Sequence, residues 1–130
     1  IIMILAQQYN ILWATSWIAI YPTIHAIKKE KYDLALATGI VFLTSVNYWR
    51  DPSQHRNRLI DIMTVRSVLL FQLYKSLLLN NKKYMFLVPA GVSSYLLGCH
   101  FYQKKQYWIA TYFHMGLHII GNLGNFILID

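Results

Sequence analysis

The chain alternates long apolar stretches with short polar gaps, and this alternation constrains its fold more than any single motif. A helix needs ~20 apolar residues to cross the hydrocarbon of a membrane. None of the stretches alternates with period two, so helices are expected rather than strands. Short gaps make consecutive helices antiparallel neighbours. We therefore predict one all-α domain over residues 1–130, an integral membrane bundle of about five transmembrane helices. The expected spans are Tyr9–Ile27, Leu34–Trp49, Leu59–Leu79, Tyr84–Tyr102 and Tyr107–Ile129.

Composition supports a multi-pass integral membrane protein. Of the 130 residues, 56% are hydrophobic and 13% are charged, with a mean hydropathy of +0.35. Average soluble domains carry about 25% charged residues. The net charge of +7 is spread between apolar stretches rather than gathered on a polar face. This pattern argues against nucleic acid and favours lipid head groups and other membrane subunits as partners.

The basic residues of the gaps do not orient the chain in a membrane. With five spans, the first and third gaps share one side and the second and fourth share the other. Each side receives five basic residues, so the positive-inside rule gives no orientation, and the sequence does not specify an organelle or viral membrane. One side carries Lys28, Lys29, Lys31, Lys82 and Lys83. On the other side, the predicted contacts to lipid or partner are Arg50, Arg56, Arg58, Lys104 and Lys105.

Three local features refine this prediction. The apolar stretch Ile1–Ala6 has no basic region before it, so we do not expect a signal peptide. Cys99 is the single cysteine, which excludes an internal disulfide framework. Pro22 and Pro89 fall inside spans and are expected to kink them.

The last span carries a polar stripe. Its members recur at steps of three and four, so on a helix they share one face. Polar side chains at membrane depth need partners, which here are other helices, a cofactor, a metal or trapped water. We therefore predict that the stripe marks the inward face of this helix. It consists of Thr111, His114, His118, Asn122 and Asn125.

The pair His114 and His118 has the spacing of metal ligands on one helix face. Asp61 is the best-placed third ligand, followed by His100 on the same side, whereas His25 lies on the opposite side. Alternatively, these histidines hydrogen-bond across helices and fix the packing of the bundle. Haem is a weaker alternative, because two histidines on one helix at this spacing cannot occupy opposite axial positions.

A basic loop precedes the third span, so several interactions are possible for Asp61. Asp61 can pair with Arg58 or favour the start of its own helix. Alternatively, Arg56 and Arg58 bind a lipid phosphate there. Arg66 lies deeper in the span and either pairs with Asp61 or contacts a partner subunit.

The ordered set Ser45, Asp61, His114 and His118 resembles the pattern of the superfamily that contains alkaline ceramidases and adiponectin receptors. These are seven-helix membrane proteins, several of them zinc-dependent amide hydrolases. Their pattern is Ser-x-x-x-His at a helix end, Asp early in the next helix, and His-x-x-x-His in the last. The resemblance implies that His114 and His118 ligate zinc, with Ser45 and Asp61 near the activated water. Trp49 stands where the pattern has its third zinc histidine.

The incomplete catalytic set favours a non-catalytic role over an enzyme. We expect a structural or accessory subunit of a larger membrane assembly. The alternatives are a zinc-dependent membrane hydrolase of the ceramidase type, active or degenerate, and a protein that binds lipid or pigment. Zinc is the cofactor that the hydrolase would require, and the sequence does not favour it.

Overall fold

The computed structural model describes residues 6–130 and contains helices and no strand within that range, which confirms the all-α prediction. Most of the apolar N-terminal stretch, residues 1–5, lies outside the described residues. Because α1, the 3-10 helix η1 and α2 follow one another directly, they form one continuous unit, called here the first rod. The five rods therefore correspond to the five predicted helices. The elements are α1 (Ala6–Ser16), η1 (Trp17–Ala19), α2 (Ile20–Lys28), α3 (Tyr32–Arg50), α4 (His55–Leu78), α5 (Lys82–Gln103) and α6 (Tyr107–Ile129).

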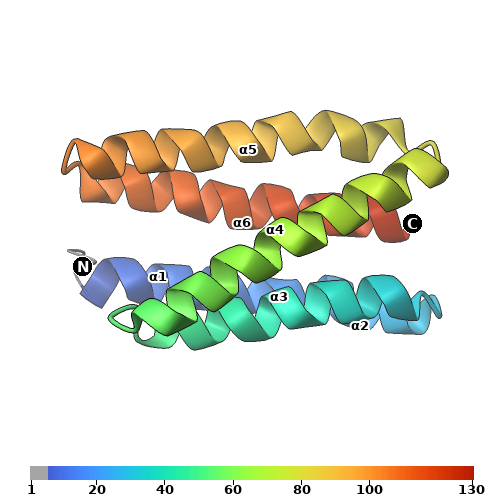
Figure 1. Ribbon diagram of the computed structural model, residues 1–130, viewed down its shortest axis with the longest axis horizontal. Coiled ribbons are helices and arrows are strands. Elements are labelled where there is room, and N and C mark those ends of the chain that lie inside the picture. The colour runs from blue at the N-terminus through green and yellow to red at the C-terminus, as the bar shows by residue number, and fades with distance from the viewer. Residues whose placement is uncertain (1–5) are drawn as a thin grey trace.

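The rods form a bundle in which α4 lies at an angle to the others. Figure 1 shows the first rod beside α3, α5 beside α6, and α4 crossing diagonally between these two groups. Helix α6 packs against α5 and against the first rod, whereas α4 packs along α3 and touches α5 much less. Helix α1 begins at the end of the bundle opposite to the one where α6 ends (Figure 1), as an odd number of antiparallel rods requires.

The first rod is broken where the sequence places a proline. Pro22 lacks an N–H, and its ring crowds the carbonyl four residues earlier, that of Ile18. Ile18 lies in η1, so the tighter 3-10 turn occupies the stretch where the α-helical hydrogen bonds are interrupted. The kink predicted at Pro22 takes this form, whereas α5 runs through Pro89 as one helix.

Three connections use the same hydrogen-bonded turn. One residue with positive φ follows each helix end: Glu30 at 58°, Asn80 at 51° and Lys105 at 60°. The next N–H then donates to the carbonyl five residues back, as from Lys31 to Ala26 at 2.9 Å. This Schellman arrangement satisfies carbonyls at the helix end and reverses the chain. The α2–α3, α4–α5 and α5–α6 pairs are thus held antiparallel by local geometry.

Small residues bring α5 and α6 close together. A Cβ added at Gly116 would lie 3.3 Å from Ser94 Oγ, and one at Gly124 would lie 3.4 Å from the ring of Tyr84. Ser94 Oγ donates to the Phe113 carbonyl across the same interface at 2.6 Å. The two backbones can approach this closely because no larger side chain separates them.

Large apolar side chains cover much of the outer surface. Phe86 is 86% exposed, Leu70 69% and Met63 67%. Within the described residues, α5 is the one helix that is both long enough and apolar enough to cross a membrane by length and composition. The first rod is divided into two short helices, α4 contains Asp61 and Arg66, and polar groups interrupt α6. All five predicted spans are therefore helical, and α5 alone meets the membrane criterion.

An ion pair joins the first turn of α3 to the last turns of α4. Lys75 Nζ lies 2.6 Å from Asp33 Oδ2, so the long lysine side chain reaches toward the polar end of the bundle. The hydrogen bond from Lys75 lowers the pKa of Asp33 below 3.8. Both side chains are partly exposed, which limits the contribution of the pair to roughly 1 kcal/mol or less.

We expect Lys75→Met to destabilise the bundle at neutral pH and to have no such effect in strong acid. Because the pKa of Asp33 is lowered in the folded state, the contribution is fully present above 3.8 and is lost as the pH falls through the lowered value. Thermal unfolding in detergent, at about pH 7 and about pH 2, measures the difference between variant and parent. Lys82→Met, which removes an exposed lysine with no ion pair in residues 6–130, is the control. An equal cost at both pH values would contradict the assignment.

Candidate functional site

The polar stripe of α6 lies toward the other rods. Thr111 and Asn122 are buried, and the other three residues are half-buried. The Thr111 hydroxyl donates to the Tyr107 carbonyl of its own helix at 2.8 Å. The remaining four side chains line one cavity between the rods. The cavity-lining members are His114, His118, Asn122 and Asn125.

This cavity has a volume of about 390 Å³ and is lined by residues of all five rods. Its walls are mainly apolar, from Val41 of α3 to Leu117 of α6. Small-molecule sites commonly have roughly 300–1,000 Å³ and a few convergent polar groups. In addition to the stripe residues, the polar lining contains Ser16, Thr38, Ser45, Asp61, Arg66, Gln72, Tyr84 and Tyr95.

His118 is held by the first rod. Its Nδ1 lies 2.7 Å from Thr15 Oγ1, and that hydroxyl donates to the Leu12 carbonyl at 3.1 Å. The imidazole and the hydroxyl thus share a hydrogen bond that joins α6 to the first rod. Asn122 Nδ2 donates to the His118 carbonyl at 2.8 Å. The predicted hydrogen bonding of His118 across helices is thus present.

His114 lies between His118 and an indole. Its ring centroid is 4.9 Å from that of His118 and 5.0 Å from that of Trp49, both edge to face. Trp49 is 7% exposed. Its Nε1 is the one buried side-chain nitrogen or oxygen in residues 6–130 that has no hydrogen-bond partner.

Asp61 bonds to α3 rather than to an arginine. Its Oδ1 accepts from Thr44 Oγ1 at 3.0 Å and from Ser45 Oγ at 2.9 Å. The ion pairs among the described residues include none between Asp61 and Arg58 or Arg66. The predicted pairing of Asp61 with either arginine is therefore wrong, because two α3 hydroxyls occupy the carboxylate oxygen instead.

The predicted zinc ligands do not form a complete donor set. Residues 6–130 contain no group of three or more His, Cys, Asp or Glu arranged to hold a metal ion. The indole of Trp49 can only donate a hydrogen bond and cannot ligate. His100 lies edge to face against Phe101 at 5.3 Å, and His25 Nε2 bonds to Asp130 Oδ1 at 2.6 Å. The side chains around His114 and His118 thus do not fit a zinc site with three protein ligands.

A second network was not foreseen from the sequence. Tyr84 OH donates to Gln72 Oε1 at 2.8 Å, and Gln72 Nε2 donates to Asn125 Oδ1 at 2.9 Å. Asn125 Nδ2 in turn donates to Asn122 Oδ1 at 3.3 Å. Gln72, 5% exposed, thereby links α4, α5 and α6. A glutamine in the apolar part of a predicted span was the signal that could have identified it.

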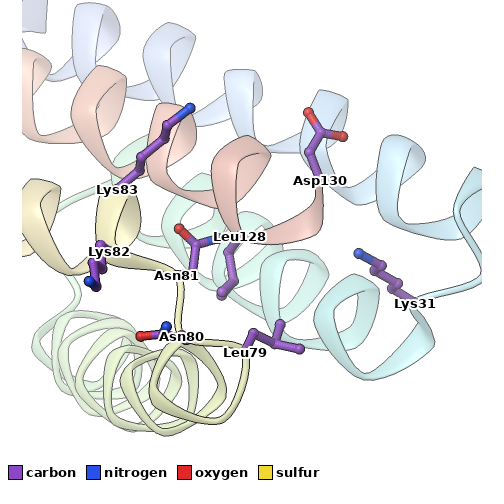
Figure 2. A pocket seen from close by; sticks show the side chains of 8 residues that line it. All are labelled: Lys31, Leu79, Asn80, Asn81, Lys82, Lys83, Leu128 and Asp130. Atoms are coloured by element: carbon purple, nitrogen blue, oxygen red, sulfur yellow. The ribbon is translucent and has the colours of Figure 1, made fainter.

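The basic residues of the connections between helices lie at the two ends of the bundle. The predicted lipid or partner contacts are exposed and occupy the end that holds the α3–α4 and α5–α6 connections (Figure 1). At the opposite end, Figure 2 shows Lys31, Lys82 and Lys83 around an open hollow of about 640 Å³. Lys31 Nζ donates to the Ile129 carbonyl there, and the hydrogen bond from His25 lowers the pKa of Asp130. The first group comprises Arg50, Arg56, Arg58, Lys104 and Lys105.

Gln72→Leu should destabilise the bundle by about 1–3 kcal/mol, because the Tyr84 hydroxyl and the Asn125 amide lose their buried partner. Thermal or denaturant unfolding in detergent measures this change. Gln103→Leu, at an exposed position, should change stability by no more than about 0.5 kcal/mol. Equal stability of Gln72→Leu and the parent would show that the network does not hold these helices together.

Comparison with protein-family models, curated proteins and solved structures found no match to this chain. The superfamily resemblance carried by Ser45, Asp61, His114 and His118 stays a prediction.

Proposed function

We propose that this chain is a multi-pass integral membrane protein that acts as a non-catalytic accessory subunit of a larger membrane assembly. The observation that carries the proposal is the bonding of the would-be catalytic side chains. Asp61 bonds to Thr44 and Ser45, His118 bonds to Thr15, and an indole stands in the third ligand's place. Such bonds stabilise helix contacts and leave no assembled catalytic group.

The outer surface supports the membrane part of this proposal. Large apolar side chains are exposed on every rod, among them Tyr21, Leu43, Leu70, Leu96 and Tyr112. In water, exposed apolar area of this extent is an aggregation liability, whereas lipid or partner helices cover it without penalty. Polar side chains, by contrast, are buried between the rods. This inside-out distribution suits a bundle surrounded by hydrocarbon.

The zinc-dependent hydrolase is a second candidate because one observation favours it. Ser45, Asp61, His114 and His118, matched by order along the sequence, line the same cavity. A relative that has lost its metal histidine to Trp49 would keep this arrangement as packing. An active hydrolase would need a third ligand that residues 6–130 do not supply.

We expect the chain to remain in the membrane pellet after an alkaline carbonate wash and to migrate in mild detergent far above its own 15.3 kDa. Arg56→Gln combined with Arg58→Gln should release it from the larger species, because these exposed charges lie at the predicted partner-binding end. Lys82→Gln combined with Lys83→Gln makes the same charge change at the opposite end. Release into the wash supernatant, or a lone monomer of unchanged stability, would contradict the proposal.

Metal analysis separates the two candidates. The purified protein should contain far less than stoichiometric zinc, and Trp49→His, which restores an imidazole beside His114, should raise zinc binding. Near-stoichiometric zinc in the parent, lost in His114→Ala with His118→Ala and kept in His55→Ala, would support the hydrolase instead.

A further inference from the structure

Arg66 is a cation without an anion. It lies in α4 and lines the central cavity, where it is the one lysine or arginine among the lining residues. The ion pairs found in residues 6–130 use His25, Lys29 and Lys75 as their cations. Asp61, the acid of the same cavity, is turned to the hydroxyls of α3. Arg66 is exposed at the side of α4 and therefore lines the cavity without an ion-pair partner in the described part of the chain.

The position of Arg66 along α4 makes the missing ion-pair partner important. At a rise of about 1.5 Å per residue, it lies roughly 16 Å along α4 from His55, near the middle of a helix about 36 Å long. An arginine near the centre of a membrane helix is rare and usually meets an acid or a water-filled cavity. If the bundle spans lipid, an anion beside Arg66 removes most of this penalty.

The cavity beside Arg66 is suited to a slender ligand. Its volume of about 390 Å³ is at the lower end of small-molecule sites. A partner helix, about 10 Å across with its side chains, is too wide to enter it. Val65 of α4 and Val92 of α5 line the cavity and are 37% and 41% exposed, so the cavity opens sideways between these two helices. Contact between α4 and α5 is sparse, which leaves room for a chain to pass.

We infer that the cavity binds a single-chain amphiphile whose carboxylate head group pairs with Arg66. A guanidinium matches the two oxygens of a carboxylate, and one unpaired arginine balances one negative charge. The apolar tail extends past Val65 and Val92 into the surrounding lipid. This inference rests on the membrane part of the proposed function and is independent of whether the chain has protein partners.

The test uses the full chain in phosphatidylcholine vesicles and a pyrene-labelled hexadecanoic acid, with the corresponding alcohol as the uncharged probe. The parent should bind the acid more tightly than the alcohol. Arg66→Gln should weaken binding of the acid about tenfold or more and leave binding of the alcohol unchanged, since a hydrogen bond to a charged group is lost. Arg66→Lys should retain part of the preference, and Arg56→Gln, the same charge change outside the cavity, should retain all of it.

A second variant tests the cavity without changing charge. A Cβ at Gly121, which lines the cavity, would meet no atom within 4 Å, so Gly121→Leu should fold and fill the space. It should weaken binding of both probes. Acid binding unaffected by Arg66→Gln and Gly121→Leu would overturn the inference, as would Arg66→Gln releasing a protein partner without altering acid binding. Because the carbonate wash is independent, a membrane-bound chain that binds no acid refutes this inference alone.

Discussion

Buried polar groups in apolar helices must find their hydrogen bonds inside the bundle, and the rest of this structure depends on that requirement. The bonds form a closed circuit around the cavity. His118 joins α6 to the first rod, Asp61 joins α4 to α3, and Gln72 joins α4 to α5 and α6. The circuit closes between the first rod and α3, where Thr23 Oγ1 donates to Thr38 Oγ1 at 2.9 Å. In the proposed membrane setting, apolar side chains alone would not define a unique partner for each helix face, because lipid is as apolar as they are.

The same circuit explains why a space remains in the centre. Hydrogen bonds fix the distance between the helices that they join, and α4 meets its partners at Asp61 and Gln72 while crossing at an angle. Between these two attachments, α4 cannot settle fully against α5. At Gly116 and Gly124, by contrast, α6 packs closely against side chains of α5 and leaves little space. Cavity and close packing thus follow from where polar and small residues lie.

Much of the fold could be predicted from hydropathy alone, because each helix is bounded by a polar gap. The span Tyr107–Ile129 coincides with α6, and the other helix ends differ from the prediction by a few residues, where polar residues such as Asp33 and His55 extend helices beyond their apolar parts. The partners of the stripe could not be predicted, since Thr15 and Gln72 are distant in sequence and their helices' crossing geometry decides which side chains meet. The bonding of Asp61 to Ser45 needed that geometry too.

The long separation between Thr15 and His118, 103 residues, has a consequence for how the chain assembles. The Schellman turns let α2 with α3, and α5 with α6, form as hairpins from neighbouring segments. Helix α1, in contrast, obtains its polar partner from α6, which is synthesised much later. Until α6 is in place, Thr15 lacks its hydrogen bond to His118 and Gln72 lacks its hydrogen bond to Asn125. The packing of α6 against the other helices therefore completes the hydrogen-bond circuit.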